Sequence, residues 1–328
     1  MSYGGYSRYE DALIAKMRIH EWYSSHHGEK YLHNFFGSMN SHHDPKERLS
    51  IDGLVYIQRQ MIQRADPIYV SMDITDLVDH ARWSFEPEPL LPGDPFVPSG
   101  FAIFPKPIYT EDAPVDDKHP GRYKEGIPVR AVSWMPMHTE DLSAGCYWIA
   151  FYQHIDDDFL LANGAERWDD EMRAWMRRYA PLLIGHQFQW SWGQVPGESA
   201  ALVYDNETEE QGSLRAKMQS ALMQTFWRIG QQRVPVPERV PRGLWRDSKR
   251  KGIEHRDVKV MTLRRAREKH EVEPSGRTMK VRSITSGHWR NQWYSSIQEH
   301  RQIWIFPYMR GPEDAPLIQP TRAVEFKR

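Results

Sequence analysis

Apolar residues in this sequence follow helical spacing in some stretches and strand spacing in others, and the two kinds of stretch do not alternate regularly. Regular alternation would indicate a doubly wound parallel sheet, so the irregular order argues against that architecture. The pattern instead predicts an α+β fold with a helical N-terminal segment, a central antiparallel or mixed sheet and a basic, β-rich C-terminal region.

Along the chain, helices are predicted before, between and after the central strands. Ser7 and Glu10 have the spacing of a capping box ahead of a first helix. A second helix is expected to begin after Ser50, and residues 166–179 also have a helical pattern. The strongest helical spacing begins at Leu214, and Gly230 is expected to close that helix.

Aromatic and β-branched residues mark the best strand candidates, Val129–Met135 and Tyr147–Tyr152, which we expect to pair with each other. Seven prolines between Glu86 and Pro107 predict a loop or an extended segment on the surface. Prolines at positions 235, 237 and 241 then interrupt regular structure and mark a boundary.

The formal net charge of −1 hides two regions of opposite sign. Residues 233–328 hold 22 basic and 11 acidic side chains, whereas residues 1–232 hold 21 basic and 33 acidic ones. We therefore predict a helical segment 1–66, an acidic α+β region 67–232 and a basic β-rich region 233–328. Such asymmetry favours an anionic partner for the basic region, or docking of that region on the acidic one.

Composition excludes several classes of protein. Aromatic residues make up 12% of the chain, which provides enough apolar surface to exclude disorder throughout. The single cysteine, Cys146, excludes an internal disulfide and a four-thiolate zinc site, and its apolar neighbours predict a buried, inert thiol. Six histidines between His20 and His43 miss the zinc spacing, so we assign no metal ligand, and the cofactor is left open. We see no secretory signal and no membrane-spanning run, and we expect a cytoplasmic protein.

Basic and aromatic residues interleave between residues 286 and 317. If strands cover 287–293 and 300–306, the period of two places His288 and Arg290 on one face, and the returning strand brings His300 and Arg301 nearby. A histidine can act as general acid or base, and arginines stabilise phosphate charge. The candidate catalytic residues are therefore His288, Arg290, His300 and Arg301.

A second set of residues in the basic region suits nucleic acid, because arginine recognises phosphate and aromatic rings stack on bases. Its members are Arg264, Arg265, Arg282, Trp289, Trp293 and Tyr294. The basic run 241–252 belongs to the same region. The alternative interpretations are a solvated basic surface, or a tryptophan core over which the arginines stack.

The C-terminal stretch also resembles a known group of sequences. Gly287–Tyr294 reads Gly-His-Trp-Arg-Asn-Gln-Trp-Tyr, and His-Arg-x-x-Trp-Ile-x-Pro-Tyr, Gly-Pro-Glu and Ala-Pro-Leu follow it. This pattern is similar to that of uncharacterised proteins from actinobacteria and their phages. The resemblance implies an origin in such a bacterium or a mobile element, and it supplies no activity or catalytic residue.

Three functional hypotheses remain at this point. The first is a protein directed at RNA or single-stranded DNA, such as a nuclease or a toxin-like or defence effector. The second is a non-enzymatic protein-interaction module with an aromatic partner surface. The third is an enzyme acting on a nucleotide or a phosphorylated small molecule, so the sequence leaves open whether the protein is an enzyme.

Overall fold

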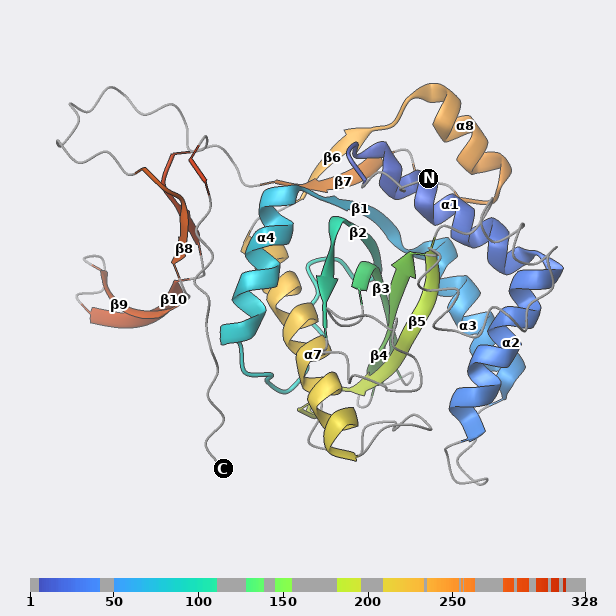
Figure 1. Ribbon diagram of the computed structural model, residues 1–328, viewed down its shortest axis with the longest axis horizontal. Helices are drawn as coiled ribbons and strands as arrows, with labels where there is room; N and C mark the ends of the chain where they lie inside the picture. The colour runs from blue at the N-terminus through green and yellow to red at the C-terminus, as the bar shows by residue number, and fades with distance from the viewer. Residues whose placement is uncertain are drawn as a thin grey trace.

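The computed structural model describes residues 6–41, 50–110, 128–138, 145–154, 182–195, 209–232, 235–253, 255, 257–262, 280–285, 288–294, 299–305, 308–312 and 315–316. These residues have an α+β fold in which helices cover a mixed sheet (Figure 1). The helices are α1 (Glu10–Ser24), α2 (His26–Ser41), α3 (Ile51–Arg64), α4 (Met72–Ala81), α7 (Glu209–Gln232) and α8 (Arg242–Arg250), with a 3₁₀ turn η1 (Arg82–Ser84). The strands are β1 (Asp66–Val70), β2 (Gly100–Tyr109), β3 (Pro128–His138), β4 (Gly145–His154), β5 (Leu182–Ser191), β6 (Val236–Arg239), β7 (Asp257–Met261), β8 (Ser283–Thr285), β9 (His288–Tyr294), β10 (Glu299–Ile305) and β11 (Tyr308–Arg310).

A seven-stranded sheet in the order β5-β4-β3-β2-β1-β7-β6 forms the centre of the fold. β1 runs parallel to β2 and β7, and the other neighbouring strands are antiparallel. The predicted mixed sheet is confirmed. The expected pairing of β3 with β4 is confirmed as well, with Ala131 opposite Tyr152. β6 and β7, which follow the predicted boundary after residue 232, belong to this sheet.

Each face of the sheet has its own hydrophobic core. On one face, α1, α2 and α3 pack over the strands, and Phe36 contacts Trp148 of β4. On the other face, α4 and α7 pack, and Phe226 and Trp227 contact Trp134 of β3. Because side chains alternate along a strand, the central strands supply residues to both cores.

The start of α1 differs from the prediction. No side chain caps the first turn, so the expected capping box of Ser7 and Glu10 is wrong. The Asp11 carboxylate instead accepts the backbone N–H groups of Ser7 and Arg8, at 3.0 and 2.9 Å. A carboxylate of the first turn therefore orders the chain that enters the helix, where it also complements the helix dipole.

The second predicted helix start is confirmed, whereas the predicted end of α7 is wrong. The Ser50 hydroxyl accepts the backbone N–H of Gly53 at the start of α3. α7 continues past Gly230 to Gln232. Gly230 serves close packing, because a Cβ atom there would lie 2.0 Å from Cδ1 of Phe96.

The proline-rich stretch ends in a central strand, which corrects the prediction of a surface segment for all of Glu86–Pro107. Residues 85–99 have no regular secondary structure, but β2 begins at Gly100 and is largely buried. The register between β2 and β3 shifts between Ile103 and Ile108, where the last two prolines lie. An irregularity of this kind lets a strand contain prolines, which cannot donate to the ladder.

The predicted β-rich C-terminal region is confirmed as two small antiparallel ladders, β9–β10 and β8–β11. The Arg282 guanidinium lies 3.6 Å from the Asp73 carboxylate at the start of α4. Its backbone N–H donates to the carbonyl oxygen of Pro316 at 2.9 Å. Arg282 therefore links this region to the main fold.

Two further predictions from the sequence concern the Cys146 thiol and membrane-spanning helices. Cys146 lies buried on β4, as predicted, and burial raises the pKa of its thiol. A raised pKa lowers the thiolate fraction and hence the reactivity. Among the described helices, none is both long and apolar enough to cross a membrane.

Candidate functional site

α8 divides into an inward apolar face and an outward basic face. Leu244 and Trp245 pack against the core on the α1 side of the sheet, and Ser248 is buried with them. The opposite face presents four exposed cations at positions i, i+4, i+7 and i+8: Arg242, Arg246, Lys249 and Arg250. This spacing places them on a single helix face.

The C-terminal end of α8 is held by a Schellman motif. The backbone N–H of Gly252 donates to the Lys249 carbonyl at 3.1 Å, and that of Ile253 donates to the Ser248 carbonyl at 2.9 Å. Gly252 has a φ of 77°, which suits glycine at this position. Because Ile253 is fully buried, the turn fixes the end of the helix to the core.

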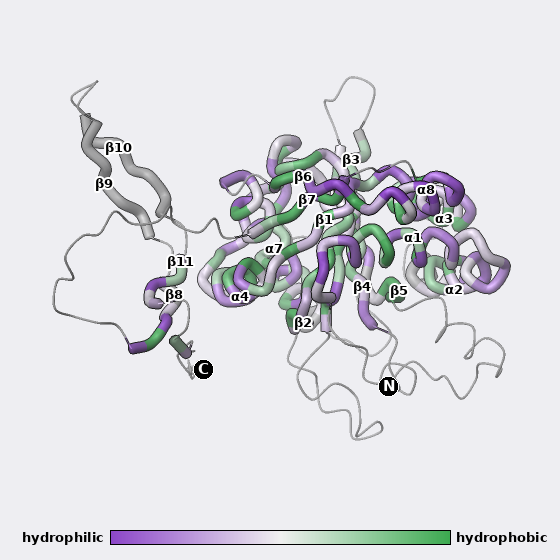
Figure 2. Tube along the Cα trace, turned by 90° about the horizontal axis from the view of Figure 1, so that it is seen from above, coloured by the Kyte–Doolittle hydropathy of each residue, from purple (hydrophilic) through white to green (hydrophobic). Residues whose placement is uncertain are grey.

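Contacts with α1 and with its N-cap residue, Tyr9, hold both ends of the α8 segment. Before the helix, the Tyr9 hydroxyl donates to the Arg239 carbonyl at 3.1 Å. After it, the Lys251 ammonium lies 3.0 Å from the Glu21 carboxylate. α8 accordingly lies beside α1 in Figure 1, and Figure 2 shows the hydrophilic character of the α8 segment. The basic face is therefore carried by an element attached at both ends.

Three of the four cations on this face have no acidic partner among the described residues. Arg242, Arg246 and Lys249 make no ion pair among the described residues, nor does the exposed Arg239 of β6, whereas Arg250 lies 3.4 Å from Asp247. Several other cations are paired with carboxylates: Arg59 with Glu29, Lys106 with Asp76, Arg228 with Glu88, and Lys259 with Asp66. The exposed Lys30, Arg64 and Lys217 make no ion pair among the described residues either, but they lie on three different helices. The α8 face therefore presents positive charge that the protein does not neutralise locally.

The first turn of α8 also runs against helix electrostatics. It contains Arg242 and no acidic residue, and no side chain caps it. The N-terminal end of a helix carries a partial positive charge, so a cation there is unfavourable by a few tenths of a kcal/mol. The helix dipole therefore does not explain Arg242, whereas it favours Lys249 and Arg250 in the last turn. A feature that breaks a local rule without a structural gain is a candidate for function.

A group of ionisable residues lies beneath the turn that follows α8. The Lys16 ammonium is fully buried and donates to the carbonyls of Ala65, at 2.5 Å, and Gln63, at 3.2 Å, at the end of α3. Burial lowers the pKa of Lys16 to about 7. Asp66 lies 2.9 Å from Lys259 and 3.8 Å from His255. Lys16 caps α3, so this group is primarily structural and supports the α8 segment.

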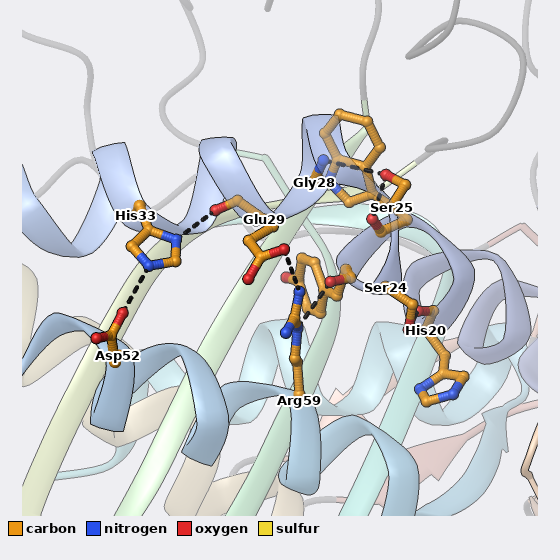
Figure 3. A network of polar contacts seen from close by, with 10 residues as sticks. His20, Ser24, Ser25, Gly28, Glu29, His33, Asp52 and Arg59 are labelled. Atoms are coloured by element: carbon orange, nitrogen blue, oxygen red, sulfur yellow. Dashed lines mark hydrogen bonds and ion pairs between the residues drawn. The ribbon is translucent and has the colours of Figure 1, made fainter.

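The N-terminal histidines contribute to packing between helices. His33 Nδ1 lies 2.8 Å from the Glu29 carbonyl, and His33 Nε2 lies 2.9 Å from the Asp52 carboxylate (Figure 3). The hydrogen bond to the Glu29 carbonyl, followed by the one to Asp52, raises the pKa of His33. Arg59 donates to the Tyr23 carbonyl at 2.7 Å. Among the described residues, no group of three His, Cys, Asp or Glu could hold a metal ion.

Another histidine, on β4, contacts the segment that leads into α1. His154, at the end of β4, has its Nε2 atom 3.1 Å from the Tyr6 hydroxyl. Burial, followed by the nearby charge of Arg130, lowers the pKa of His154 to about 4. Burial raises the pKa of Tyr6. This neutral pair was not found from the sequence, because Tyr6 and His154 are far apart along the chain.

The predicted catalytic residues lie on the β9–β10 ladder, whose existence the sequence correctly predicted. The register places His288 opposite Ile305, Arg290 opposite Ile303 and Arg301 opposite Gln292. By the period of two, His288, Arg290 and Arg301 share one face, whereas His300, opposite Trp293, belongs to the other face. The four predicted residues therefore do not share one face.

The predicted nucleic-acid-binding residues are distributed as follows. Trp289 and Trp293 share the face of His300, and Tyr294 shares the face of His288. Arg282 makes the link to Asp73 described above. Arg264 and Arg265 lie outside the described residues, as do 166–179. The sequence prediction missed the exposed face of α8, because the number of charges in 241–252 does not show which of them share a helix face. The spacing of Arg242, Arg246 and Lys249 was the signal that could have found it.

Comparisons with known proteins add no assignment: no family model, no curated protein and no solved structure matches this chain. The resemblance of the C-terminal stretch to actinobacterial and phage proteins therefore stays a prediction.

Proposed function

We propose that this protein binds nucleic acid and that the exposed face of α8 contacts the phosphate backbone. The observation that carries the proposal is the set of unpaired cations, Arg242, Arg246 and Lys249, on one face of an anchored helix. Neutralising phosphates with Lys and Arg releases counterions from the nucleic acid, and this release drives binding. A cationic face that lacks internal partners is ready for such a ligand.

The arginine content of the face supports phosphate as the recognised group. Arginine presents a planar fork that can donate two hydrogen bonds to one phosphate, whereas lysine acts as a point charge. Arg242 and Arg246 lie one turn apart on α8, so successive turns offer one fork each. Contacts of this kind position a protein on nucleic acid without reading its bases. We therefore expect little sequence specificity from α8 alone.

The test measures binding of the full chain to a labelled single-stranded oligonucleotide over a range of salt concentrations. The wild-type affinity is expected to fall steeply with salt. In the variant Arg242→Gln/Arg246→Gln/Lys249→Gln, the slope of log K against log salt should become shallower by roughly 2, since each lost contact to a single strand removes about 0.7.

The matched control replaces three exposed cations on other helices, Lys30→Gln, Arg64→Gln and Lys217→Gln. The net charge changes equally in both triple variants, so a non-specific charge effect would lower the two slopes alike. That result would refute the α8 interface, and a wild-type protein that binds no oligonucleotide would refute the function itself.

A second candidate function is cleavage of the bound strand at the β9–β10 ladder. The specific observation is the register, which puts His288 on the same face as Arg290 and Arg301. In this hypothesis His288 is the general acid or base, and the two arginines stabilise the phosphate. His288→Ala should then abolish cleavage and preserve binding, whereas His300→Ala should have little effect. Cleavage that survives in His288→Ala would rule this assignment out.

A further inference from the structure

Trp83 is an exposed tryptophan whose ring is held in place from one side. It lies in η1, directly after α4, and its exposed fraction is 59%. The guanidinium carbon of Arg82 lies 4.2 Å from the centroid of the Trp83 ring. One side of the ring is therefore in contact with a cation, although more than half of the residue remains open to solvent.

Arg82 is itself fixed, because its side chain is almost fully buried. It donates to the Asp79 carboxylate at 3.0 Å and to the Tyr109 carbonyl, at the end of β2, at 2.5 Å. The ring of Trp83 thus rests on a side chain that is bonded to both α4 and the sheet. A preorganised aromatic side chain loses little conformational entropy on binding a ligand, so this arrangement favours recognition.

A similar arrangement occurs two residues further along the chain. The guanidinium carbon of Arg228, on α7, lies 4.7 Å from the centroid of the Phe85 ring, and Arg228 also forms an ion pair with Glu88. Both arginines in these stacks are paired with carboxylates, as is Lys106 with Asp76 on α4. The cations of these stacks are therefore compensated, whereas the exposed Glu86 makes no ion pair among the described residues.

The cation on one side of Trp83 limits what the ring can bind. A cation is attracted to the electron-rich face of an indole, and Arg82 already uses that attraction. A second cation, such as a quaternary ammonium group, would be repelled by the first. A flat, electron-rich ring can still stack, because offset stacking depends on contact area as well as on the ring quadrupole. Nucleobases have this chemistry, and stacking on them tolerates any base.

We infer that Trp83 is a stacking site for an unpaired base of a single-stranded nucleic acid. The inference rests on the proposed function for its ligand, but it uses a surface and a type of interaction different from those of α8. α8 would contribute salt-sensitive contacts with phosphates. Trp83 would contribute a salt-insensitive contact that requires a base free to leave its own stack, so it would distinguish single strands from duplexes.

The experiment compares Trp83→Ala with the wild type on an oligoadenylate of about ten nucleotides, a length within the range of single-strand sites. Loss of one stacked base should weaken single-strand binding by about 5- to 150-fold. The slope of log K against log salt should stay unchanged. Binding to a duplex of the same length should also stay unchanged. Trp83→Phe should recover part of the affinity for the single strand. The control is Tyr56→Ala, which removes an aromatic residue of similar exposure, 62%, from α3.

The outcomes separate this inference from the proposed function. A Trp83→Ala protein that binds the single strand as tightly as the wild type overturns the stacking site. Equal losses for single strand and duplex, or an equal loss in Tyr56→Ala, overturn it as well. If Trp83→Ala weakens binding while the α8 triple variant does not, the α8 interface fails and the stacking site stands. If the wild type binds no oligonucleotide, both fail.

Discussion

α8 and the 3₁₀ turn η1 contain the same pair of neighbouring residue types, Trp and Arg, with opposite burial. In α8, Trp245 packs toward the core and Arg246 is exposed. At η1, Arg82 is buried and Trp83 is exposed. The two surfaces that result differ in chemistry: α8 presents charge, whereas η1 presents an aromatic ring.

Pairing explains why the difference is possible. Arg82 can be buried because Asp79 and the Tyr109 carbonyl satisfy its donors. Arg246 has no such partner among the described residues and stays in water. Of these two arginines, the one whose donors are satisfied is buried and structural, and the one without a partner is exposed and available for a ligand. Counting arginines along the sequence cannot separate the two cases.

The largest effect expected from this comparison concerns stability. Arg82→Ala should lower the free energy of unfolding by about 1–3 kcal/mol, because it leaves the Tyr109 carbonyl and the partly exposed Asp79 carboxylate without their donor. Arg246→Ala, the matched change on α8, should alter it by no more than about 0.5 kcal/mol. Urea denaturation of both variants measures the difference. Similar losses in the two proteins would show that burial does not separate these arginines.

The general fold class was accessible from the sequence because it depends on local patterns. The Ser50 cap and the pairing of β3 with β4 follow from residue types within short distances. The pairing of β1 with β7 was not accessible, since Ile68 and Lys259 meet only in the folded chain. The prolines of β2 were misread because a central strand normally excludes them.

The candidate sites were harder to predict than the fold. A composition bias located the basic region, but exposure and pairing decided which cations are available. Arg242 and Arg282 have the same residue type and lie in the same region, yet only Arg282 has a carboxylate partner, Asp73, among the described residues. The stacked pair of Arg82 and Trp83 lies outside the basic region altogether. Its signal would have been a buried arginine, which no sequence pattern reveals.

A second prediction uses pH to sharpen the contrast between the two faces of the sheet. His154 and His255, on the α1 side, have their pKa lowered from 6.5 to about 4, mainly by burial. The unfolded chain then binds more protons than the folded one between these values, so stability is complete above pH 6.5 and falls as the pH drops toward 4. Each histidine lowers the free energy of unfolding by about 3 kcal/mol at most over this pH range.

The corresponding variant is His154→Gln/His255→Gln, and its unfolding free energy should depend less on pH between 6.5 and 4 than that of the wild type. Urea denaturation at several pH values measures the slope. His80→Gln, on α4, serves as the control from the other side of the sheet. A slope that is the same in the double variant and the wild type would mean that burial of these two rings does not set the acid sensitivity.

The smallest expected effects on stability concern two glycines, Gly230 in α7 and Gly243 in α8. Gly230→Ala in α7 places a Cβ atom 2.0 Å from Phe96 Cδ1 and 2.3 Å from Cε1, so the ring must move. Overpacking of this kind costs about 1–3 kcal/mol, offset by up to about 1 kcal/mol from the better helix propensity of alanine.

Gly243→Ala in α8 meets no atom within 4 Å and should stabilise the protein by up to about 1 kcal/mol. Thermal unfolding of the two variants should therefore shift in opposite directions, because α7 is packed on the side where its glycine lies and α8 is open there. A lower midpoint for Gly243→Ala would show that the exposed side of α8 is covered in solution, which would also count against its proposed contact with phosphates.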